Sequence, residues 1–402
     1  RDRATGRGRG MRILAVVPYP PRADATHGGA RAAAGLLVRL ARRHPVAIAY
    51  LREAREPPVD DELRGLADTV VEAAMPDLGD SVWAQRRRRA TAALRGRPTW
   101  ADERSVPELH TRLRELAHTW KPDVAQLHFQ VASVYSGDLP GLPTVLVVYE
   151  PGTAHAATGR RGPSPRLDEA VWRRFERRAL RDADATVALT ERDRKALLEL
   201  GQPARIDVIP LGIDIPTEPF DAQGRDEVVC FVGNFRHTPN VDAARRLATA
   251  IFPRVAAERP EARLRLVGAD PPPDILALAG ERIAVAASVP DVRPELERAA
   301  VVAIPLRLGG GMRVKTLEAL AAGKAVVASA AAVEGIDAKD GVQIRLAEDD
   351  EKFAAAIVEL LESPERRVKL GGAARAWAES NAGWEGRVDE HERLLRSLVE
   401  RR

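Results

Sequence analysis

Short apolar runs and longer amphipathic stretches alternate along most of this chain. The runs lack the polar alternation of a half-exposed strand, so each one predicts a strand buried on both faces, as in a parallel sheet. In the first half we expect such strands at 13–17, 46–51, 123–128, 144–149 and 185–190, with helices at 31–43, 167–181 and 191–200. This alternation predicts an α/β fold with parallel sheets.

The second half repeats the alternation after an interruption. Residues 206–226 are rich in proline and glycine, which indicates a linker between two units. Beyond it we expect strands at 227–232, 263–267, 283–285, 301–306 and 324–328, with helices at 241–257 and from 351 onward. Residues 60–120 are basic and predict mainly helix. Two serial α/β units are expected to enclose a cleft, with ligands at the carboxyl ends of the strands.

The segment 299–329 carries the strongest chemical signal. After its apolar strand, three glycines at 309–311 precede a helix that Gly323 ends as a C′ residue. A strand, a loop without side chains and a helix N-terminus form an anion site, because backbone N–H groups and the helix dipole point at one place. Lys315 and Glu318 share one face of that helix. A cation can bind a phosphate, and a carboxylate beside it can accept hydrogen bonds from two vicinal hydroxyls of a ribose. Together they predict a site for a nucleotide-activated substrate.

A second strand-to-loop crossing, FVGNFRH, begins the second unit. Gly233 allows the backbone to approach a ligand closely, and Arg236 offers a guanidinium for a charge-assisted bond to phosphate. We expect both crossings at one sheet edge, which favours phosphate binding over an ordinary surface turn.

Three positions end strands of the first unit. Gly28-Gly29 follows the first strand, and a close approach of backbone to substrate and a plain flexible turn fit it equally well. His128 and Glu150 follow later strands, where their side chains are expected to face the cleft. An isolated histidine at such a place more often has a structural role. Glu150 fits a base or a holder of an acceptor hydroxyl as well as it fits a solvated loop carboxylate.

Charge and residue usage narrow the functional classes. Lys and Arg number 62 against 58 Asp and Glu, and this excess of +4 is too small to indicate binding of nucleic acid. The cluster Arg86–Arg89, continued by Arg95 and Arg97, predicts a solvated helix face, or else a contact with an anionic membrane surface or a lipid-phosphate acceptor. The eight histidines form no cluster at metal-ligand spacing, so we expect no metal site.

The cysteine content and the length of the apolar runs point to a compartment. Cys230 is the single cysteine, which excludes an internal disulfide and fits a reducing environment. No run reaches the roughly twenty apolar residues of a membrane helix. We therefore expect a cytoplasmic protein, or one that visits the inner face of the membrane. Residues 1–10 are predicted to be a disordered basic extension ahead of Met11.

These motifs together resemble the retaining glycosyltransferases of the GT-B fold, family 4 in particular. The resemblance covers nearly the whole chain from Met11, and it is carried by FVGNFRHTPNVDAARRL, LRLVGADPPP, SVPDVRPELERAAVVAIPLRLGGGMRVKTLEALAAGKAVVAS and AAVEGI. VIPLGID is similar to the segment that links the two domains in that family, and ESNAGWEGRVDEHERLLRSL resembles its helix returning to the N-terminal domain.

The resemblance implies two Rossmann-like domains facing across a cleft. Residues 11–210 would bind the acceptor, residues 211–385 would bind the nucleotide sugar, and residues 386–402 would be the returning helix. The implied donor-binding residues are Gly233, Asn234, Arg307, Gly310, Gly311, Met312, Arg313 and Glu318. Among them, Glu318 would hold the ribose hydroxyls.

The catalytic and acceptor-side residues are also implied. Lys315 and Arg236 would balance the charge of the diphosphate, and Glu150 would assist the acceptor, which would lie near Gly28, Gly29 and His128. Such enzymes typically need no metal and no cofactor besides the nucleotide sugar.

The sequence departs from the family pattern at three places. Gly310 occupies the position of the first glutamate of the family's E-x7-E motif, and Glu150 stands where many members carry histidine. The arginine and lysine of the family's phosphate loop fall near Asn234 and Pro239. Acceptor activation is therefore the role that the residues define least.

The leading hypothesis is transfer of a sugar from a nucleoside diphosphate to a hydroxyl group, with retention of configuration. The acceptor could be a glycan, a lipid-linked glycan or a small metabolite. A non-catalytic nucleotide-binding homologue and a nucleotide-sugar epimerase of the same fold are the alternatives.

Overall fold

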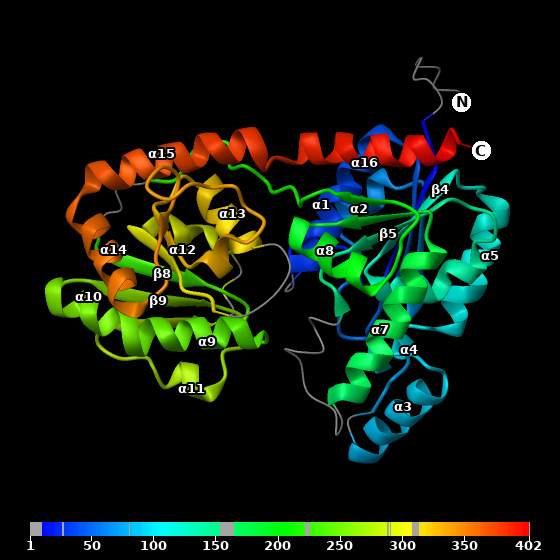
Figure 1. Ribbon diagram of the computed structural model, residues 1–402, viewed down its shortest axis with the longest axis horizontal. Coiled ribbons are helices and arrows are strands. Elements are labelled where there is room, and N and C mark those ends of the chain that lie inside the picture. The colour runs from blue at the N-terminus through cyan, green and yellow to red at the C-terminus, as the bar shows by residue number, and fades with distance from the viewer. Residues whose placement is uncertain are drawn as a thin grey trace. The chain divides into compact units, whose positions relative to one another are not determined.

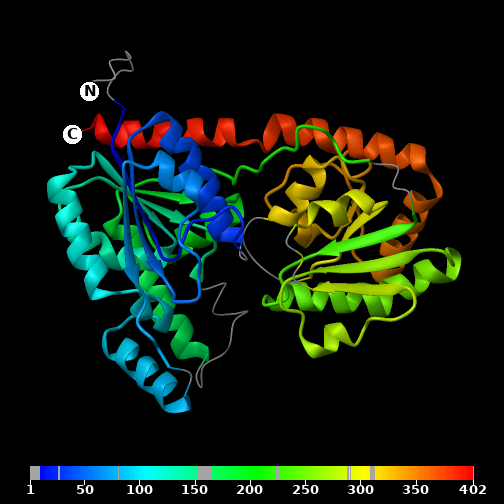
Figure 2. The same ribbon diagram turned by 180° about the vertical axis from the view of Figure 1, so that it is seen from behind.

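The computed structural model of the chain describes residues 10–25, 28–79, 81–152, 165–221, 226–287, 289, 291–307 and 313–401. The chain divides into two compact units (Figure 1). Unit 1 comprises Arg1–Pro210 together with Glu385–Arg402, and unit 2 comprises Leu211–Trp384. Each unit is built on one parallel sheet with helices on both faces, as the view from behind also shows (Figure 2).

The sheet of unit 1 has seven strands in the order β3-β2-β1-β4-β5-β6-β7. The strands are β1 (Ile13–Val17), β2 (Val46–Arg52), β3 (Thr69–Ala74), β4 (Val124–His128), β5 (Thr144–Val148), β6 (Ala185–Ala188) and β7 (Ile206–Val208). All neighbouring strands are parallel. Every residue of β1, β4 and β5 is buried, which explains why their sequences are continuous apolar runs.

Helices cover the two faces of this sheet. Among the described residues of unit 1 they are α1 (Gly28–Arg43), α2 (Asp61–Leu66), α3 (Val82–Leu94), α4 (Thr99–Glu103), α5 (Pro107–Thr119), the 3-10 helix η1 (Gln130–Asp138), α7 (Pro165–Asp182), α8 (Glu191–Leu200) and α16 (Trp384–Val399). The five strands and the three helices predicted for the first half are confirmed, and none of their ends is shifted by more than three residues.

Two predictions for unit 1 are wrong, and a third missed a strand. Gly28 and Gly29 form the first turn of α1 rather than a loop before it. The region 60–120 is mainly helical as predicted, but it also contains strand β3, whose half-buried residues at the sheet edge weaken the apolar signal. The segment predicted as a linker begins with β7, because Ile206–Val208 pairs with β6 as the last strand of the sheet.

The C-terminal helix α16 belongs to unit 1, where it lies beside α1 (Figures 1 and 2). The Arg43 guanidinium of α1 pairs with three carboxylates of α16, at 2.5 Å from Glu385, 2.5 Å from Asp389 and 2.7 Å from Glu392. On the inner side, the buried His391 Nδ1 lies 3.4 Å from the amide nitrogen of Gln126 in β4. The last helix is therefore a structural part of the N-terminal sheet unit.

Unit 2 contains a six-stranded parallel sheet in the order β10-β9-β8-β11-β12-β13. Its strands are β8 (Val228–Val232), β9 (Arg263–Gly268), β10 (Ile283–Ala287), β11 (Val301–Ile304), β12 (Val326–Ala328) and β13 (Arg345–Leu346). Its helices are α9 (Thr238–Arg246), the π-helical turn η2 (Leu247–Ile251), α10 (Phe252–Glu258), α11 (Pro273–Leu276), α12 (Arg293–Arg298), α13 (Val314–Ala321), the 3-10 turn η3 (Ala330–Val333), α14 (Asp350–Glu362) and α15 (Pro364–Asn381). Figure 1 shows α9 and α11 on one side of the sheet and α12 and α13 on the other.

The predicted strands of the second half are confirmed, and two details differ. The helix predicted at 241–257 is interrupted by the π-turn η2, and its first turn already begins at Thr238. Lys324, expected to begin a strand, is fully buried, and its ammonium donates to the carbonyls of Asp221 and Glu297 at 2.5 and 3.2 Å. Gly323 ends α13 with φ of +73°, as its C′ position predicted.

Candidate functional site

The candidate donor site lies at the carboxyl edge of the sheet in unit 2. Strands β8 and β11 are parallel neighbours there, so the loop after Val232 and the segment after Ile304 leave the sheet side by side. Glycine is required at this edge: a Cβ on Gly268 would lie 1.8 Å from the carbonyl oxygen of Gly233. The Gly233 amide also donates to the Val267 carbonyl at 2.9 Å. The loop after β8, which begins at Gly233, is thus held by close contact with the backbone at the end of β9.

Lys315 is the central cation of this edge. Its side chain, from the first turn of α13, reaches back to α9 and donates a hydrogen bond to the Oδ1 of Asn240. Its ammonium also lies 5.1 Å from the centroid of the Phe231 ring, within cation–π range. Burial, with a contribution from the nearby Arg313 charge, lowers the pKa of Lys315 to about 7, and Glu318 opposes that shift.

Asn240 is a site residue that the sequence reasoning missed. Its side chain is 9% exposed, and its Nδ2 donates to the backbone carbonyl of Asn234 at 2.6 Å. The same amide accepts the Lys315 hydrogen bond, so it joins the loop after β8 to helix α13. The signal was a short polar residue at the start of a helix that follows a strand, the position where such side chains bind backbone groups.

The two other predicted cations of the donor site are held in ion pairs. Arg236 lies 2.6 Å from a carboxylate oxygen of Asp270, and Arg307 lies 2.6 Å from Asp242. Both guanidinium side chains are more than half exposed, so these pairs contribute little to stability and can be exchanged for a phosphate at small cost. The predicted contact of Arg236 with phosphate requires such an exchange.

The remaining donor-side predictions divide into two groups. Gly310, Gly311 and Met312 lie outside the described residues. Arg313 precedes α13, and its buried guanidinium donates to the Ala331 carbonyl at 2.7 Å and lies 3.2 Å from Glu334. Its side chain therefore fixes the loop after β12, while its backbone carbonyl accepts hydrogen bonds from the amides of Thr316 and Leu317 in α13. Glu318 is partly buried in the second turn of α13.

The predicted acceptor-side glycines have a packing role. A Cβ on Gly29 would lie 2.5 Å from the Phe129 ring and 3.1 Å from the Tyr19 hydroxyl. Glycine is therefore needed in the first turn of α1 whether or not a substrate approaches it.

The expectation that His128 faces the cleft is wrong, whereas its burial fits the structural role that an isolated histidine more often has. It is fully buried at the end of β4, where its Nδ1 lies 3.0 Å from the Tyr149 hydroxyl. Burial, together with the nearby His391, lowers its pKa to about 3, so the ring is neutral at physiological pH.

Glu150 lies two residues after β5 and is partly exposed, and its backbone carbonyl accepts a hydrogen bond from Gln130 at 2.5 Å.

An aromatic cluster at the carboxyl edge of the unit 1 sheet is a second feature that the sequence did not reveal. Phe129 follows β4 with φ of +64°, a conformation that non-glycine residues seldom adopt outside functional sites and tight turns. Its ring stacks on Tyr149 at a centroid distance of 4.1 Å and meets Tyr19 edge-on at 4.8 Å. Trp100 lies 6.4 Å from Phe129 and 6.1 Å from Trp172. Aromatic rings are rare in this chain, and these five come from five separate segments.

Two units with parallel Rossmann-like sheets define the class of the protein, which is the GT-B fold. Solved structures with this fold are similar over nearly the full length. Sucrose-phosphate synthase from Thermosynechococcus elongatus has a TM-score of 0.74 and 16% identity, over 98% of this chain and 100% of its own. HepE of Anabaena, solved with UDP and glucose, has a TM-score of 0.67 and 16% identity, over 96% of this chain and 100% of its own.

Family models match both units. The model for glycosyltransferase family 4 matches residues 26–216, and the model for glycosyl transferases group 1 matches residues 226–363. Both models describe glycosyltransferases, so each unit of the chain matches a glycosyltransferase model.

A curated relative is 29% identical over 207 residues. It is the GDP-mannose-dependent monoacylated alpha-(1-6)-phosphatidylinositol monomannoside mannosyltransferase of Corynebacterium glutamicum. The match spans 44% of this chain and about half, 52%, of that protein.

Proposed function

We propose that the protein transfers a sugar from a nucleoside diphosphate sugar to a hydroxyl group, with retention of anomeric configuration and without a metal ion. The observation that carries this proposal is the pairing of Lys315 with Asn240 at the carboxyl edge of the unit 2 sheet. The family models that match both units support it, because they describe glycosyltransferases, and so does the likeness of the fold to sucrose-phosphate synthase.

The environment of Lys315 suits a diphosphate. Among the described residues, no carboxylate oxygen lies within ion-pair distance of its ammonium, and its hydrogen-bond partner is a neutral amide. A diphosphate would supply the missing negative charge in a site with little water, where a charge pair is stronger than at the surface. As the glycosidic bond to the sugar breaks, negative charge grows on the leaving phosphate, and a fixed ammonium stabilises that charge.

The ribose and sugar contacts complete the proposal. Glu318, one helical turn after Lys315, would accept hydrogen bonds from the ribose hydroxyls. The acceptor would bind to unit 1 near Glu150 and the aromatic cluster, because a flat ring stacks well against a sugar or another ring. Retention would be tested directly by the anomeric proton signal of the product in an NMR spectrum.

The first test is thermal stabilisation of the purified protein by UDP, GDP, ADP and TDP and their sugar conjugates, in buffer containing EDTA. A stabilised transition with one nucleotide series supports a metal-independent donor site and identifies the base. Conversion of the donor without an acceptor would instead support an epimerase. Binding without turnover on any acceptor would support a non-catalytic homologue.

The affinity for a nucleotide sugar should depend on pH through Lys315. In the free protein this lysine loses its proton near pH 7, while a bound diphosphate would favour the protonated form and raise its pKa. Binding above pH 7 therefore takes up a proton, and affinity should fall by up to about tenfold per pH unit as the pH rises from 7. Below pH 7 the affinity should be constant.

Isothermal titration with a nucleoside diphosphate sugar checks this, because its diphosphate does not itself titrate in this range. The Lys315→Met variant is the control, and its weaker binding should be flat with pH. A wild-type affinity that stays constant from pH 7 to 9 would contradict the assignment.

We also propose that helix α3 contacts an anionic membrane. Trp83 and Leu94 are 78% and 90% exposed and lie three helical turns apart on one face, with Arg87 between them. The Arg86 guanidinium lies 5.7 Å from the Trp83 ring centroid. Exposed apolar side chains flanked by arginines are typical of helices that lie in the membrane interface. The name of the curated relative gives it a phosphatidylinositol mannoside as acceptor, which makes a lipid-linked acceptor a reasonable proposal here.

The prediction of four solvated arginines at 86–89 needs one correction. The side chain of Arg88 is only 21% exposed, because its guanidinium pairs with Glu103 at 2.8 Å and donates to the carbonyl of Gly79.

None of the helices in the part of the chain that the structure describes has the length and the apolar character needed to span a bilayer.

Partitioning onto phosphatidylglycerol vesicles tests this contact. We expect Arg87→Gln to weaken it about fivefold, since each basic residue near an anionic surface contributes about 1 kcal/mol. Arg112→Gln, an exposed arginine of α5 paired with Glu108, is the matched control. Equal partitioning onto uncharged phosphatidylcholine vesicles would argue against an anionic surface.

A further inference from the structure

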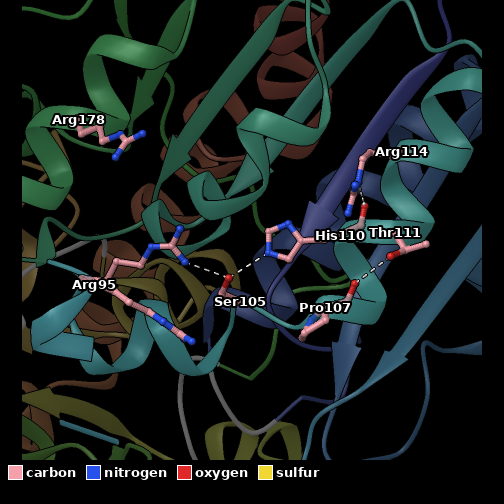
Figure 3. A pocket seen from close by; sticks show the side chains of 8 residues that line it. Arg95, Ser105, Pro107, His110, Thr111, Arg114 and Arg178 are labelled. Carbon is pink, nitrogen blue, oxygen red and sulfur yellow. Dashed lines mark hydrogen bonds between the residues drawn. The ribbon is translucent and has the colours of Figure 1, made fainter. Parts of the chain in front are cut away.

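An open pocket of about 620 Å³ lies within unit 1, separate from the donor residues of unit 2 (Figure 3). Its walls come from the segment after α3, from α5 and from α7. The polar side chains that line it include Arg95, Arg97, Ser105, His110, Arg114 and Arg178. Four guanidinium groups around one pocket are not explained by the transfer reaction at the donor site.

A chain of hydrogen bonds fixes the centre of this pocket. The Arg97 guanidinium donates to the Ser105 Oγ at 3.0 Å, and this oxygen lies 2.9 Å from the His110 Nε2. The His110 Nδ1 lies 2.5 Å from a carboxylate oxygen of Asp138. The His110 Nδ1 donates to that carboxylate, and the ring thereby presents its Nε2 to the serine hydroxyl. Figure 3 shows the Ser105 and His110 side chains pointing toward one another.

The packing around His110 holds it in this orientation. Its ring contacts the Tyr135 ring at a centroid distance of 4.5 Å, and Asp138 is largely buried behind it. The Tyr135 hydroxyl in turn accepts a hydrogen bond from the Val106 amide at 3.0 Å. The polar centre of the pocket is therefore pre-organised by the fold rather than by a ligand.

The charges of the pocket do not balance. Arg95 pairs with Asp102 at 3.1 Å, Arg114 with Asp138 at 3.2 Å, and Arg178 with Asp182 at 3.4 Å. Arg97 has no carboxylate partner among the described residues, and it is only partly exposed. Its guanidinium is thus a partly buried positive charge whose hydrogen-bond partner is a neutral hydroxyl.

We propose that this pocket binds the phosphate group of an organic phosphate ester, with Arg97 as its main ligand and with Ser105 and His110 beside it. A guanidinium offers parallel N–H groups that match two phosphate oxygens, and the serine hydroxyl can turn to donate a third hydrogen bond. The volume is in the range of small-molecule sites and leaves room for a polar remainder of the ester. This inference does not depend on the donor site in unit 2.

The phosphate could belong to a soluble sugar or polyol phosphate or to the headgroup of a phospholipid. Isothermal titration separates the two sources. The probes are glycerol phosphate, inorganic phosphate, and dihexanoyl phosphatidic acid below its micelle concentration, which avoids any binding to a membrane surface. Saturable binding of glycerol phosphate supports a soluble ester, and binding of the short-chain lipid alone supports a headgroup.

Variants connect the binding to the pocket. We expect Arg97→Gln to weaken the bound probe by at least about tenfold, as for loss of hydrogen bonds to a charged group. Ser105→Ala should weaken it by about fivefold, and Arg112→Gln, outside the pocket on α5, should leave it within about twofold. Circular dichroism and the thermal midpoint show whether each variant is folded, and Ser105→Ala keeps the test valid if Arg97→Gln is not.

Three results would overturn the proposal. The first is that wild type binds none of the three probes saturably at millimolar concentration. The second is that Arg112→Gln weakens binding as much as Arg97→Gln does. The third is that the wild type hydrolyses the probe ester and that Ser105→Ala does not. A hydrogen-bonded serine, histidine and aspartate also form the catalytic triad of hydrolases, so this result would indicate a hydrolytic site instead of a binding site.

Discussion

Replacement of Lys315 by methionine is expected to weaken binding of a nucleoside diphosphate sugar by about 1.5–3 kcal/mol, the range for hydrogen bonds to charged groups. Methionine keeps the apolar stem that packs near Phe231 and removes only the ammonium. Transfer should fall further than binding, because the leaving phosphate carries more negative charge in the transition state than in the bound substrate. Isothermal titration and a turnover assay measure the two losses separately.

Two further variants show whether Lys315 acts as a charge or as a structural contact. Lys369→Met, an exposed lysine of α15, should leave binding unchanged. Asn240→Asp places a carboxylate against the ammonium, and this internal counter-charge would compete with the diphosphate and raise the lysine pKa. We expect weaker binding in Asn240→Asp, with its pH dependence displaced upward. Unchanged nucleotide affinity in Lys315→Met would contradict the donor-site assignment.

Gly268→Ala is expected to destabilise unit 2 by about 3 kcal/mol or more, at the upper end of effects for overpacking. The added methyl would lie 1.8 Å from the Gly233 carbonyl oxygen, so the ends of β8 and β9 would have to separate. Nucleotide binding should be lost as well, because the loop after β8 would move. Hydrogen exchange of the β8 and β9 amides measures the local loss of stability.

The control for this prediction is Gly280→Ala. A Cβ on Gly280 would meet no atom within 4 Å, so this variant should unfold like the wild type. If both variants showed the same amide protection, the close backbone contact at Gly268 would not be a constraint on the fold.

The positions of most strands along the chain and their parallel direction followed from the sequence, because buried parallel strands require continuous apolar runs. The run that became β11, VVAI, is fully buried, and the glycine after α13 adopts the positive φ that its position predicted. The family of the protein was also readable, since its motifs combine glycine loops, basic residues and a helix start at fixed spacing. These are local properties, and local sequence determines them. Strands β3 and β7 escaped prediction because they lie at the sheet edges, where burial is incomplete.

Only the tertiary structure decided which polar groups meet. Lys315 and Asn240 are 75 positions apart in the chain, and no local pattern indicates that one binds the other. The sequence suggested an open His128, whereas packing of α16 and the neighbouring strands buries it and keeps it neutral. The sequence suggested a solvated Arg97, whereas the fold places its guanidinium against Ser105, and no carboxylate of the described residues pairs with it. The sequence determines which side chains can carry a charge. Their burial and their partners depend on contacts between segments that folding brings together.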